Sequence, residues 1–302
     1  MRSASDAHEA HRRVIRAIQR LSNLLKCGWL ATRNRFSSQT VLGECDVDVA
    51  LTTFGRRTAK VFLALESIGR GTARPRSLTL WLDDSYRGAS LPHSIRRLQR
   101  RGLSVRFCHD WKSYKKFYPH VQSHESFVRP LATADDDVVY PPTWLHGLWA
   151  ARARVEAPTM ISYRAHVMAL DSNAFTPYRT WAPCQTTTPS VAHFSTGVSG
   201  ALLPVELLSA LKSGGTGFLT TCPNADDVWL HFHALKQGIP VAQVSAASQL
   251  FTQIPRSQRV SLMSSNVLRD ENDSQIVDTY SLREIVAVRE AVANASGRRE
   301  PS

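Results

Sequence analysis

The stretch that decides the fold is Ala132-Thr133-Ala134-Asp135-Asp136-Asp137-Val138-Val139-Tyr140-Pro141, in which three adjacent carboxylates interrupt a run of small and apolar residues. A short run of this kind is typical of a buried strand that ends where the acidic residues begin. Open α/β sheets bind their ligands at the carboxyl ends of their strands. We therefore expect Asp135, Asp136 and Asp137 to lie at a ligand-binding edge of a sheet.

The acidic triplet needs positive charge nearby. Adjacent carboxylates repel one another by about 1 kcal/mol per close pair in water, and by more when they are partly buried. A metal cation or cationic side chains can offset this repulsion. Mg²⁺ and Mn²⁺ prefer oxygen ligands, and Mg²⁺ usually shares one or two carboxylates with substrate phosphates. Taken alone, an acidic triplet is more often a solvated loop, so the interpretation depends on the rest of the sequence.

Composition bounds the class of protein. The chain has 302 residues, 43% of them hydrophobic, which is typical of a globular protein with one large α/β domain or two small ones. Its formal net charge of +12 suggests an anionic partner: a nucleic acid, a membrane surface or a phosphorylated substrate. Arginine far outnumbers lysine, which genome composition also produces, and no run interleaves basic and aromatic residues. We therefore do not expect a nucleic-acid partner.

The cysteines and the apolar runs indicate the compartment. The five cysteines are far apart and never form a CxxC pair, which argues against a zinc ribbon and against a disulfide framework. A reducing compartment is then the default. The sequence shows no signal-peptide pattern and no apolar stretch of 18 residues. We expect a cytoplasmic protein.

The first 45 residues are predicted to form a separate segment. Residues 8–30 have the pattern of a basic amphipathic helix, and residues 33–45 are typical of a linker. Apolar residues recur at helical spacing, at Val14, Ile18, Leu21 and Leu25. Most of the arginines lie on other faces of the helix, at Arg12, Arg13, Arg16 and Arg20. Two interpretations remain. The helix packs on the domain or on a second subunit, or its basic face makes a peripheral contact with the inner face of a membrane.

From residue 46 onward strands and helices alternate. Strands are predicted at 47–52, 78–82 and 103–108, with helices at 58–68 and 91–101 between them. This order implies a parallel sheet with right-handed crossovers. Neither GxGxxG nor a Walker A pattern is present, so substrate phosphates must be held in another way, and a metal on the acidic triplet would do so.

The second half of the chain is predicted in less detail. We expect a strand ending at 134, a helix from 141 to about 155, one or two strands within 160–170, and a helix from 226 to about 238. The segment 171–190 is rich in Thr, Pro and Ser and is predicted to be a mobile excursion. The small-residue loop 195–200 either lets substrate approach the backbone or is simply a turn. Beyond 282 the pattern is helical to 295 and then disordered.

Five segments occur in an order that indicates a family. They are Leu51-Thr52-Thr53-Phe54-Gly55-Arg56-Arg57, Leu80-Trp81-Leu82-Asp83, Asp110-Trp111-Lys112-Ser113-Tyr114-Lys115-Lys116, the triplet with its flanks, and Asn224-Ala225-Asp226-Asp227-Val228-Trp229. This order resembles bacterial glycosyltransferases of the GT-A fold, close to family 2, over residues 46–275. The resemblance implies a Rossmann-type three-layer α/β/α sandwich with a mostly parallel central sheet, followed by a C-terminal helix and tail at 276–302.

The resemblance also implies a reaction. A GT-A enzyme moves a sugar from a nucleotide-diphosphate sugar, here with a UDP-sugar favoured, to a hydroxyl of a glycan or lipid-linked acceptor. Its DxD motif holds Mn²⁺ or Mg²⁺ against the donor pyrophosphate, where the metal acts as a Lewis acid. By motif position Asp135 and Asp137 are the expected metal ligands, with Asp137 the more direct, and Asp136 is expected to hydrogen-bond the ribose or sugar.

In an inverting enzyme of this family a second acidic pair supplies the general base. That pair is Asp226-Asp227 here, and we expect Asp227 to take the proton of the acceptor hydroxyl. Its predicted place at the N-terminus of a helix favours the ionised form. The other interpretation is a helix cap, since aspartate is a preferred capping residue.

The donor nucleoside is expected near the ends of the first two strands. By position in the resemblance Thr53, Arg57 and Asp83 are the candidates for binding it, although Asp84 fits nearly as well as Asp83. Of the two adjacent lysines, Lys115 is favoured over Lys116 to approach the pyrophosphate, while both fit solvent-facing positions as well.

Two other functions, nucleotidyl transfer and polyanion binding, explain only part of the sequence. A sugar-phosphate nucleotidyltransferase also uses acidic metal ligands, but its glycine-rich signature is missing around 47–55. A basic polyanion-binding protein leaves both acidic motifs unexplained.

His231 and His233 are spaced i and i+2 on a predicted helix, so their side chains point in directions too different to share a metal ion. Arg164 and His166 are candidates to line the acceptor side.

Overall fold

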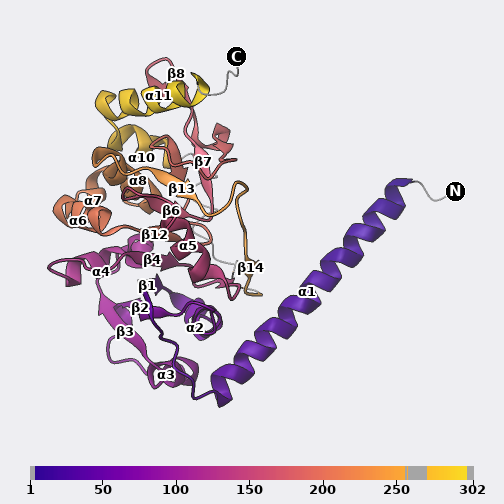
Figure 1. The fold of residues 1–302 in the computed structure, drawn as a ribbon. Coiled ribbons are helices and arrows are strands. Elements are labelled where there is room, and N and C mark those ends of the chain that lie inside the picture. Colours follow the sequence, from indigo (N-terminus) through magenta and orange to yellow (C-terminus); the bar gives the residue numbers. More distant parts are fainter. Residues whose placement is uncertain (1–3, 256, 258–270, 298–302) are drawn as a thin grey trace.

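The computed structural model describes residues 4–255, 257 and 271–297, and a central sheet runs through that part of the chain (Figure 1). The sheet has seven strands in the order β13-β6-β12-β4-β1-β2-β3. Their bounds are Cys45–Thr52 (β1), Pro75–Asp83 (β2), Leu103–Cys108 (β3), Leu131–Ala134 (β4), Met160–Ser162 (β6), Ala201–Leu203 (β12) and Val241–Gln243 (β13). β12 alone runs antiparallel to its sheet neighbours, so the predicted mostly parallel sheet is confirmed.

Helices cover both faces of the sheet, which confirms the predicted three layers. One face packs, through Val49, Leu51 and Leu80, on α2 (Phe62–Gly69), α3 (His93–Gln99) and α5 (Trp144–Arg152). The other face packs on α4 (Tyr118–Ser123), α6 (Val205–Gly214), α7 (Phe218–Thr221) and α8 (Asp226–Lys236), with α10 (Glu271–Thr279) and α11 (Leu282–Gly297) outside them. The core therefore has two halves, one on each side of the sheet.

Short strands and 3₁₀ turns complete the domain around the edge where β1, β2 and β4 end. The small strands are Val138–Val139 (β5), Ala165–Val167 (β7), Leu170–Asp171 (β8), Ala174–Phe175 (β9), Ala182–Pro183 (β10), His193–Ser195 (β11) and Thr252–Gln253 (β14). β10, β7 and β11 form one small sheet, and β14 pairs with β5 directly after the acidic triplet. The 3₁₀ turns are Gly55–Ala59 (η1), Asp84–Tyr86 (η2), Lys112–Lys116 (η3) and Tyr178–Thr180 (η4).

The N-terminal helix α1 (Ala4–Phe36) leaves the body and is joined to it near its C-terminal end (Figure 1). The helix is longer than predicted, so the expected linker at 33–45 loses its first four residues to it. The reason is a buried polar anchor: Asn34 donates to Glu66 Oε1 at 3.0 Å, and Arg101 pairs with the same oxygen at 2.5 Å. The apolar stripe predicted for this helix is exposed, at 57% for Val14, 62% for Ile18 and 59% for Leu21.

Two other segments differ from the prediction. The single helix expected at 58–68 is divided into η1 and α2, because the chain turns at Lys60, whose Nζ donates to the carbonyl of Pro255 at 2.7 Å. The excursion 171–190 is tied down: Trp181 and Cys184 are buried, and the Trp181 indole donates to Thr176 O at 3.0 Å. The helical tail is confirmed as α11; the disorder expected at its end concerns 298–302, outside the described residues.

Candidate functional site

The candidate site lies at the edge of the sheet where the parallel strands end. β4, β1 and β2 are neighbours in register, with Ala50 opposite Thr133 and Leu51 opposite Leu80. Residues that follow these strands therefore emerge side by side. This is why Thr53, Asp83 and the Asp135 triplet, far apart in the sequence, come to one edge as predicted.

Asp136 and Asp137 are both bound by Arg57. Its Nη1 donates to Asp136 Oδ1 at 2.8 Å and its Nη2 donates to Asp137 Oδ2 at 2.9 Å. The hydroxyl of the fully buried Thr53 donates to the other Asp136 oxygen at 2.6 Å. Arg57 is held in turn by the carbonyl of Ser257 at 3.2 Å. Three residues that the sequence assigned to donor binding, Thr53, Arg57 and Asp136, thus form one hydrogen-bonded unit.

Asp135 points to a different set of partners. Lys116 Nζ pairs with its Oδ1 at 3.0 Å, and the backbone N–H of Ser199 donates to its Oδ2 at 3.2 Å. The backbone N–H of Asp135 donates to the hydroxyl of Tyr140 at 2.6 Å. Trp144 donates its indole N–H to Ser199 O at 2.9 Å. The loop before β12 is therefore attached directly to the acidic triplet.

The second acidic motif opens α8 as predicted, and Lys116 connects it to the triplet. The pKa of Lys116 is raised by Asp135, Asp226 and Asp227, although burial alone would lower it. Gly197 packs directly on the carboxylate of Asp227: a Cβ at this glycine would lie 2.5 Å from Asp227 Oδ1. Burial, and next the adjacent Asp226, raises the pKa of Asp227 well above its usual value.

Asp83 and Lys115 form a neighbouring group. Lys115, which is buried, reaches Asp83 Oδ2 at 3.3 Å and Asp110 Oδ1 at 2.6 Å. Asp83 Oδ1 accepts from the backbone N–H of Ser85 at 3.0 Å and so caps η2. Burial alone would raise the pKa of Asp83, but the hydrogen bonds from Ser85 and Lys115 lower it. The lysine that pairs with the triplet is thus Lys116 and not Lys115, which the sequence favoured. Lys115 pairs with Asp83 instead, and its role in donor binding stays a prediction.

The acidic side chains of the site are held close together. Burial raises the pKa of Asp136 to about 6 even though Arg57 and Thr53 bind it, and burial, then Asp135, raises the pKa of Asp137. Within the described residues, the carboxylates of the two motifs interact with three cationic side chains: Asp135, Asp136, Asp137, Asp226 and Asp227 with Arg57, Lys116 and Arg164. A divalent cation fits the carboxylate oxygens present.

The protein supplies only part of a metal's coordination shell. Nowhere in the described ranges do three or more His, Cys, Asp or Glu side chains group so that they could hold a metal ion. Mg²⁺ is commonly bound through one or two carboxylates, with the remaining ligands taken from substrate phosphates and water. The residues present therefore fit a metal that arrives with a phosphorylated ligand.

The small sheet β10-β7-β11 forms the wall beside Asp227. Arg164 Nη2 and His166 Nε2 are 3.1 Å apart, and the ring of Tyr178 lies 5.7 Å from that of His166. Burial, followed by Arg164, lowers the pKa of His166 to about 4, so this ring is neutral near pH 7. The pKa of Tyr178 is raised to about 12 by burial and then by Asp227, which places it on the same side. The predicted acceptor-side pair is therefore close to the candidate base.

The sequence reasoning missed four residues of the site. Lys116 was ranked below its neighbour, and Tyr140, Ser199 and Gly197 were not assigned roles. A signal existed for Gly197 and Ser199, since the small-residue loop 195–200 was singled out as a place of close approach. The structure shows a turn that packs on both acidic motifs, with positive φ at Gly197, Ser199 and Gly200.

The histidines of α8 lie in the core. His231 is buried, with its Nδ1 2.7 Å from the Tyr280 hydroxyl and its Nε2 3.0 Å from Val191 O. His233 packs edge-on against Trp229. In the part of the chain that the structure describes, no helix is both long and apolar enough to cross a membrane.

Comparison with known proteins places the fold only. No family model and no curated protein matches the chain. Among solved structures, it is similar to the mannosyltransferase PcManGT from Pyrobaculum calidifontis in complex with GDP-Man and Mn²⁺ (TM-score 0.45, 14% identity, 97% of this chain and 88% of that one). It is also similar to glucosyl-3-phosphoglycerate synthase from Mycobacterium tuberculosis in complex with Mn²⁺, UDP and phosphoglyceric acid (0.40, 13%, 82% and 82%). A third is a CMP:2-keto-3-deoxy-manno-octonic acid synthetase complexed with CTP (0.43, 9%, 75% and 99%).

These likenesses are distant. The mostly parallel sheet and the layers of the structure are those of the GT-A-like sandwich that the sequence resemblance implied. Proteins of one fold carry out many functions, so the function of this chain depends on the site itself.

Proposed function

We propose that this protein is a metal-dependent, inverting glycosyltransferase that moves a sugar from a nucleotide-diphosphate sugar to an acceptor hydroxyl. The observation that carries the proposal is the meeting of two acidic motifs around one lysine. Lys116 binds Asp135 at 3.0 Å, and its pKa is also raised by Asp226 and Asp227. A donor-binding carboxylate and a base that lie near the same cationic group would hold the two substrates close together, as transfer between them requires.

Asp135 and Asp137 would hold Mn²⁺ or Mg²⁺ together with the donor pyrophosphate. When bound, the metal neutralises the charge that develops on the departing diphosphate. Arg57 fixes the geometry of the triplet by binding Asp136 and Asp137 together. Asp83, with Lys115 beside it, is positioned at the end of β2 for the nucleoside. Lys116 lies where its charge also stabilises the diphosphate.

Asp227 is proposed to accept the proton of the acceptor hydroxyl. Because its pKa is raised, its carboxylate is a stronger base than an exposed aspartate. The Gly197 backbone against one of its oxygens restricts the carboxylate to one orientation. Arg164, His166 and Tyr178 then form the wall on which the acceptor lies.

A groove beside the triplet favours a lipid-linked acceptor over a free glycan. The groove has a volume of about 470 Å³ and is lined mainly by apolar residues, among them Val138, Val198, Leu250, Phe251 and Ile254. It reaches α1 through Asn23, which donates to Gln253 O at 2.7 Å. We propose that the hydrocarbon part of the acceptor lies here, while α1 makes a peripheral contact with an anionic membrane surface.

Donor binding is the first test. Thermal unfolding of the full chain is measured with UDP-, GDP- and dTDP-sugars, each with and without Mn²⁺. We expect stabilisation that needs both one nucleotide class, UDP, and the metal. Asp137→Asn should lose the metal-dependent part of the shift, whereas Asp171→Asn, an exposed aspartate on the β8–β9 hairpin, should keep it. Equal metal-dependent shifts in Asp137→Asn and the unaltered chain would rule out this metal role.

The released product separates the proposal from nucleotidyl transfer. Glycosyl transfer releases a nucleoside diphosphate, whereas attachment of a nucleotide to a sugar phosphate releases pyrophosphate. Nucleoside diphosphate release is assayed with the sugar nucleotide identified by thermal unfolding, and pyrophosphate release with the nucleoside triphosphate of the same base and a sugar phosphate. Stabilisation by any polyanion, indifferent to metal and abolished by salt, would instead support a polyanion-binding protein.

A further inference from the structure

One face of the β1–β2–β3 half of the sheet is unexpectedly polar. Strand neighbours in register on this face are Asp48 with Ser77, and Trp81 with Arg106. The opposite face of the same strands is apolar and packs on α2 and α3. Strands of a parallel sheet that is covered on both sides are usually apolar on both faces. The polar groups of this face therefore need a ligand or solvent as hydrogen-bond partners.

A cavity of about 160 Å³ lies between this face and the chain around α4. The strands contribute Asp48, Ser77, Thr79, Trp81, Ser104 and Arg106, and the opposite wall contributes His120, His124 and Arg129. A water molecule occupies about 30 Å³ of liquid, so the cavity has room for about five waters, or for one tetrahedral oxyanion with some water. None of the acidic-site residues described above lines it.

The charge around the cavity is positive. Asp48 is the one carboxylate in the lining, and it is already bound by the Ser77 hydroxyl at 2.6 Å and by Arg129 at 3.4 Å. Arg106 lies 5.9 Å from the centre of the Trp81 ring, and within the described residues no carboxylate comes within ion-pair distance of its guanidinium. On the far side the Lys212 ammonium donates to the carbonyl of His124.

One buried hydrogen-bond donor of the lining has no partner in the described part of the protein. Trp81 is 4% exposed, and its indole N–H is buried without an acceptor. His120 is 5% exposed, and no hydrogen bond from either of its ring nitrogens is found among the described residues. An unpaired buried donor costs about 1–3 kcal/mol, so a ligand that accepts from the Trp81 indole is favoured.

Two neighbouring histidines add to the donor set. The ring centres of His120 and His124 are 4.3 Å apart, with the rings tilted by 33°. Burial lowers the pKa of His120 to about 4, helped by His124 and by the two arginines, while Asp48 opposes the effect. His120 is therefore neutral near pH 7 and carries one N–H.

We propose that this cavity binds a phosphate group, as inorganic phosphate or as the phosphate of a small ester. Arg106, Arg129, His120 and the Trp81 indole supply hydrogen-bond donors in a space of matching size, and the two arginines of the lining outnumber its one carboxylate, Asp48, by one positive charge. The inference does not rest on the proposed function, because no residue of the acidic site lines this cavity.

Calorimetric titration of the full chain with inorganic phosphate, at constant ionic strength and without metal, tests the proposal. We expect one phosphate per chain. Arg106→Gln should weaken binding at least tenfold, because charge-assisted hydrogen bonds are lost. Arg100→Gln, which removes an exposed arginine at the end of α3, should change it less than twofold. Unchanged binding in Arg106→Gln, or equal weakening in both variants, would overturn the proposal.

The position of the bound anion is checked through His120. In an NMR titration phosphate should raise the pKa of His120 from about 4, because an adjacent anion stabilises the imidazolium. Phosphate binding that leaves the His120 signals unmoved would place the anion elsewhere and refute the site. Repeating the titration with glycerol 3-phosphate identifies the source: tighter binding than inorganic phosphate indicates a phosphate ester, and weaker binding indicates the free anion.

Discussion

At the scale of single residues, Asp227 shows how tertiary structure changes a sequence-based expectation. A helix N-terminus stabilises a carboxylate by about 0.3–1 kcal/mol, which would lower its pKa. Burial against the Gly197 loop and the charge of Asp226 act in the opposite direction and outweigh the helix, so the pKa is raised. The sequence predicted an easily ionised base at this position, whereas the structure holds a carboxylate that binds its proton more strongly than usual.

Removing this base should slow transfer without weakening donor binding. For Asp227→Asn we expect the turnover rate to fall by about 10²- to 10⁴-fold, the usual contribution of a general base. The affinity for donor and Mn²⁺, measured by thermal unfolding, should stay within about threefold of the unaltered chain. A large loss of donor affinity would assign Asp227 to the donor site and contradict its role as base.

Gly197 is the second residue whose role depends on the fold. It has a φ of +64°, and a Cβ there would lie 2.5 Å from Asp227 Oδ1. We expect Gly197→Ala to cost about 1–3 kcal/mol of unfolding free energy and to displace the Asp227 carboxylate, lowering turnover. Gly238→Ala is the matched control, because Gly238 has a φ of +65° and no atom within 4 Å of its Cβ position.

Urea unfolding and transfer assays of the two alanine variants separate strain from contact. Both should lose stability through backbone strain, but only Gly197→Ala should lose activity. Equal activity of the two variants would show that the contact with Asp227 is unimportant.

At the scale of elements, α8 combines a charged N-terminus with a buried histidine in its middle. His231 is 2% exposed, and its two nitrogens are occupied by Tyr280 and by the Val191 carbonyl. Burial lowers the pKa of His231 from 6.5 to about 4. The helix is therefore held against β11 and α10 by a ring that must stay neutral.

This neutral ring makes stability depend on pH. In the unfolded chain His231 takes up a proton near pH 6.5, whereas the folded chain takes it up only near pH 4. Stability is therefore complete above pH 6.5 and is lost as the pH falls toward 4, by about 3 kcal/mol from this residue. Urea unfolding between pH 4 and 7 checks this. The slope should be smaller in His231→Gln; parallel curves for the two proteins would contradict the assignment.

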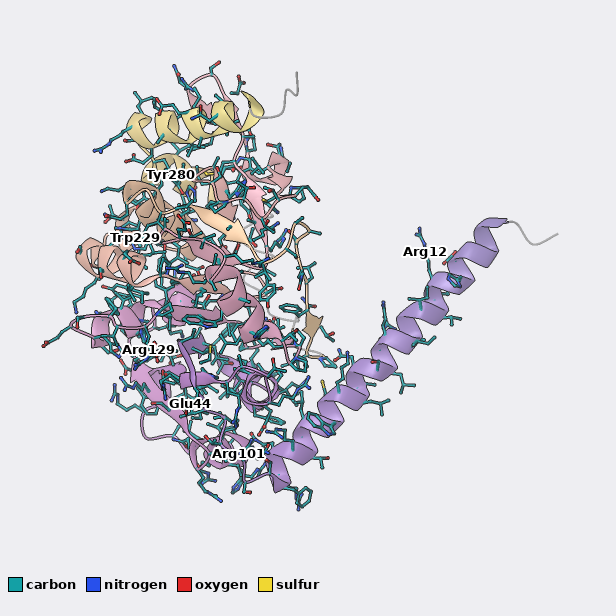
Figure 2. All side chains as sticks on the ribbon, viewed as in Figure 1. Arg12, Glu44, Arg101, Arg129, Trp229 and Tyr280 are labelled. Carbon is teal, nitrogen blue, oxygen red and sulfur yellow. The ribbon has the colours of Figure 1, made fainter. Side chains whose placement is uncertain are left out.

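At the scale of the whole molecule, α1 is the helix that extends away from the rest of the domain (Figure 1). Among the described residues, Asn34 near its C-terminal end and Asn23 hydrogen-bond the rest of the domain, and Arg12 near its other end extends away from the body (Figure 2). Its exposed apolar residues lie along one side and its basic residues on other faces. A stripe of this width flanked by arginines fits an anionic membrane surface better than the narrow seam of a coiled coil.

Membrane contact is tested with vesicles that contain anionic lipids. We expect the full chain to cosediment with them, less so as salt is raised, and not with neutral vesicles. Leu21→Glu should weaken binding at least tenfold, because it places a charge on the apolar stripe. Leu219→Glu is the matched control, since Leu219 on α7 is 52% exposed and Leu21 is 59% exposed.

The same variants distinguish the membrane from a second subunit. If the unaltered chain is a dimer in sedimentation experiments, Leu21→Glu is monomeric, and neither binds vesicles, then α1 is an interface between copies of the chain. That result would leave the acidic site untouched, because its residues lie at the edge of the sheet.

The sequence by itself determined the order of strands and helices from β1 to β3, the place of the acidic triplet at the end of β4 and the start of α8 at Asp226. These features depend on local patterns, such as the alternating residues of β3, whose predicted bounds match the structure. Tertiary structure alone decided that Lys116 and not Lys115 faces the triplet, that Arg57 binds two of its carboxylates, and that Asp227 has a raised pKa. The physical reason is that hydrogen bonds and burial depend on which segments become neighbours, and strand order and register set this between residues far apart in the chain.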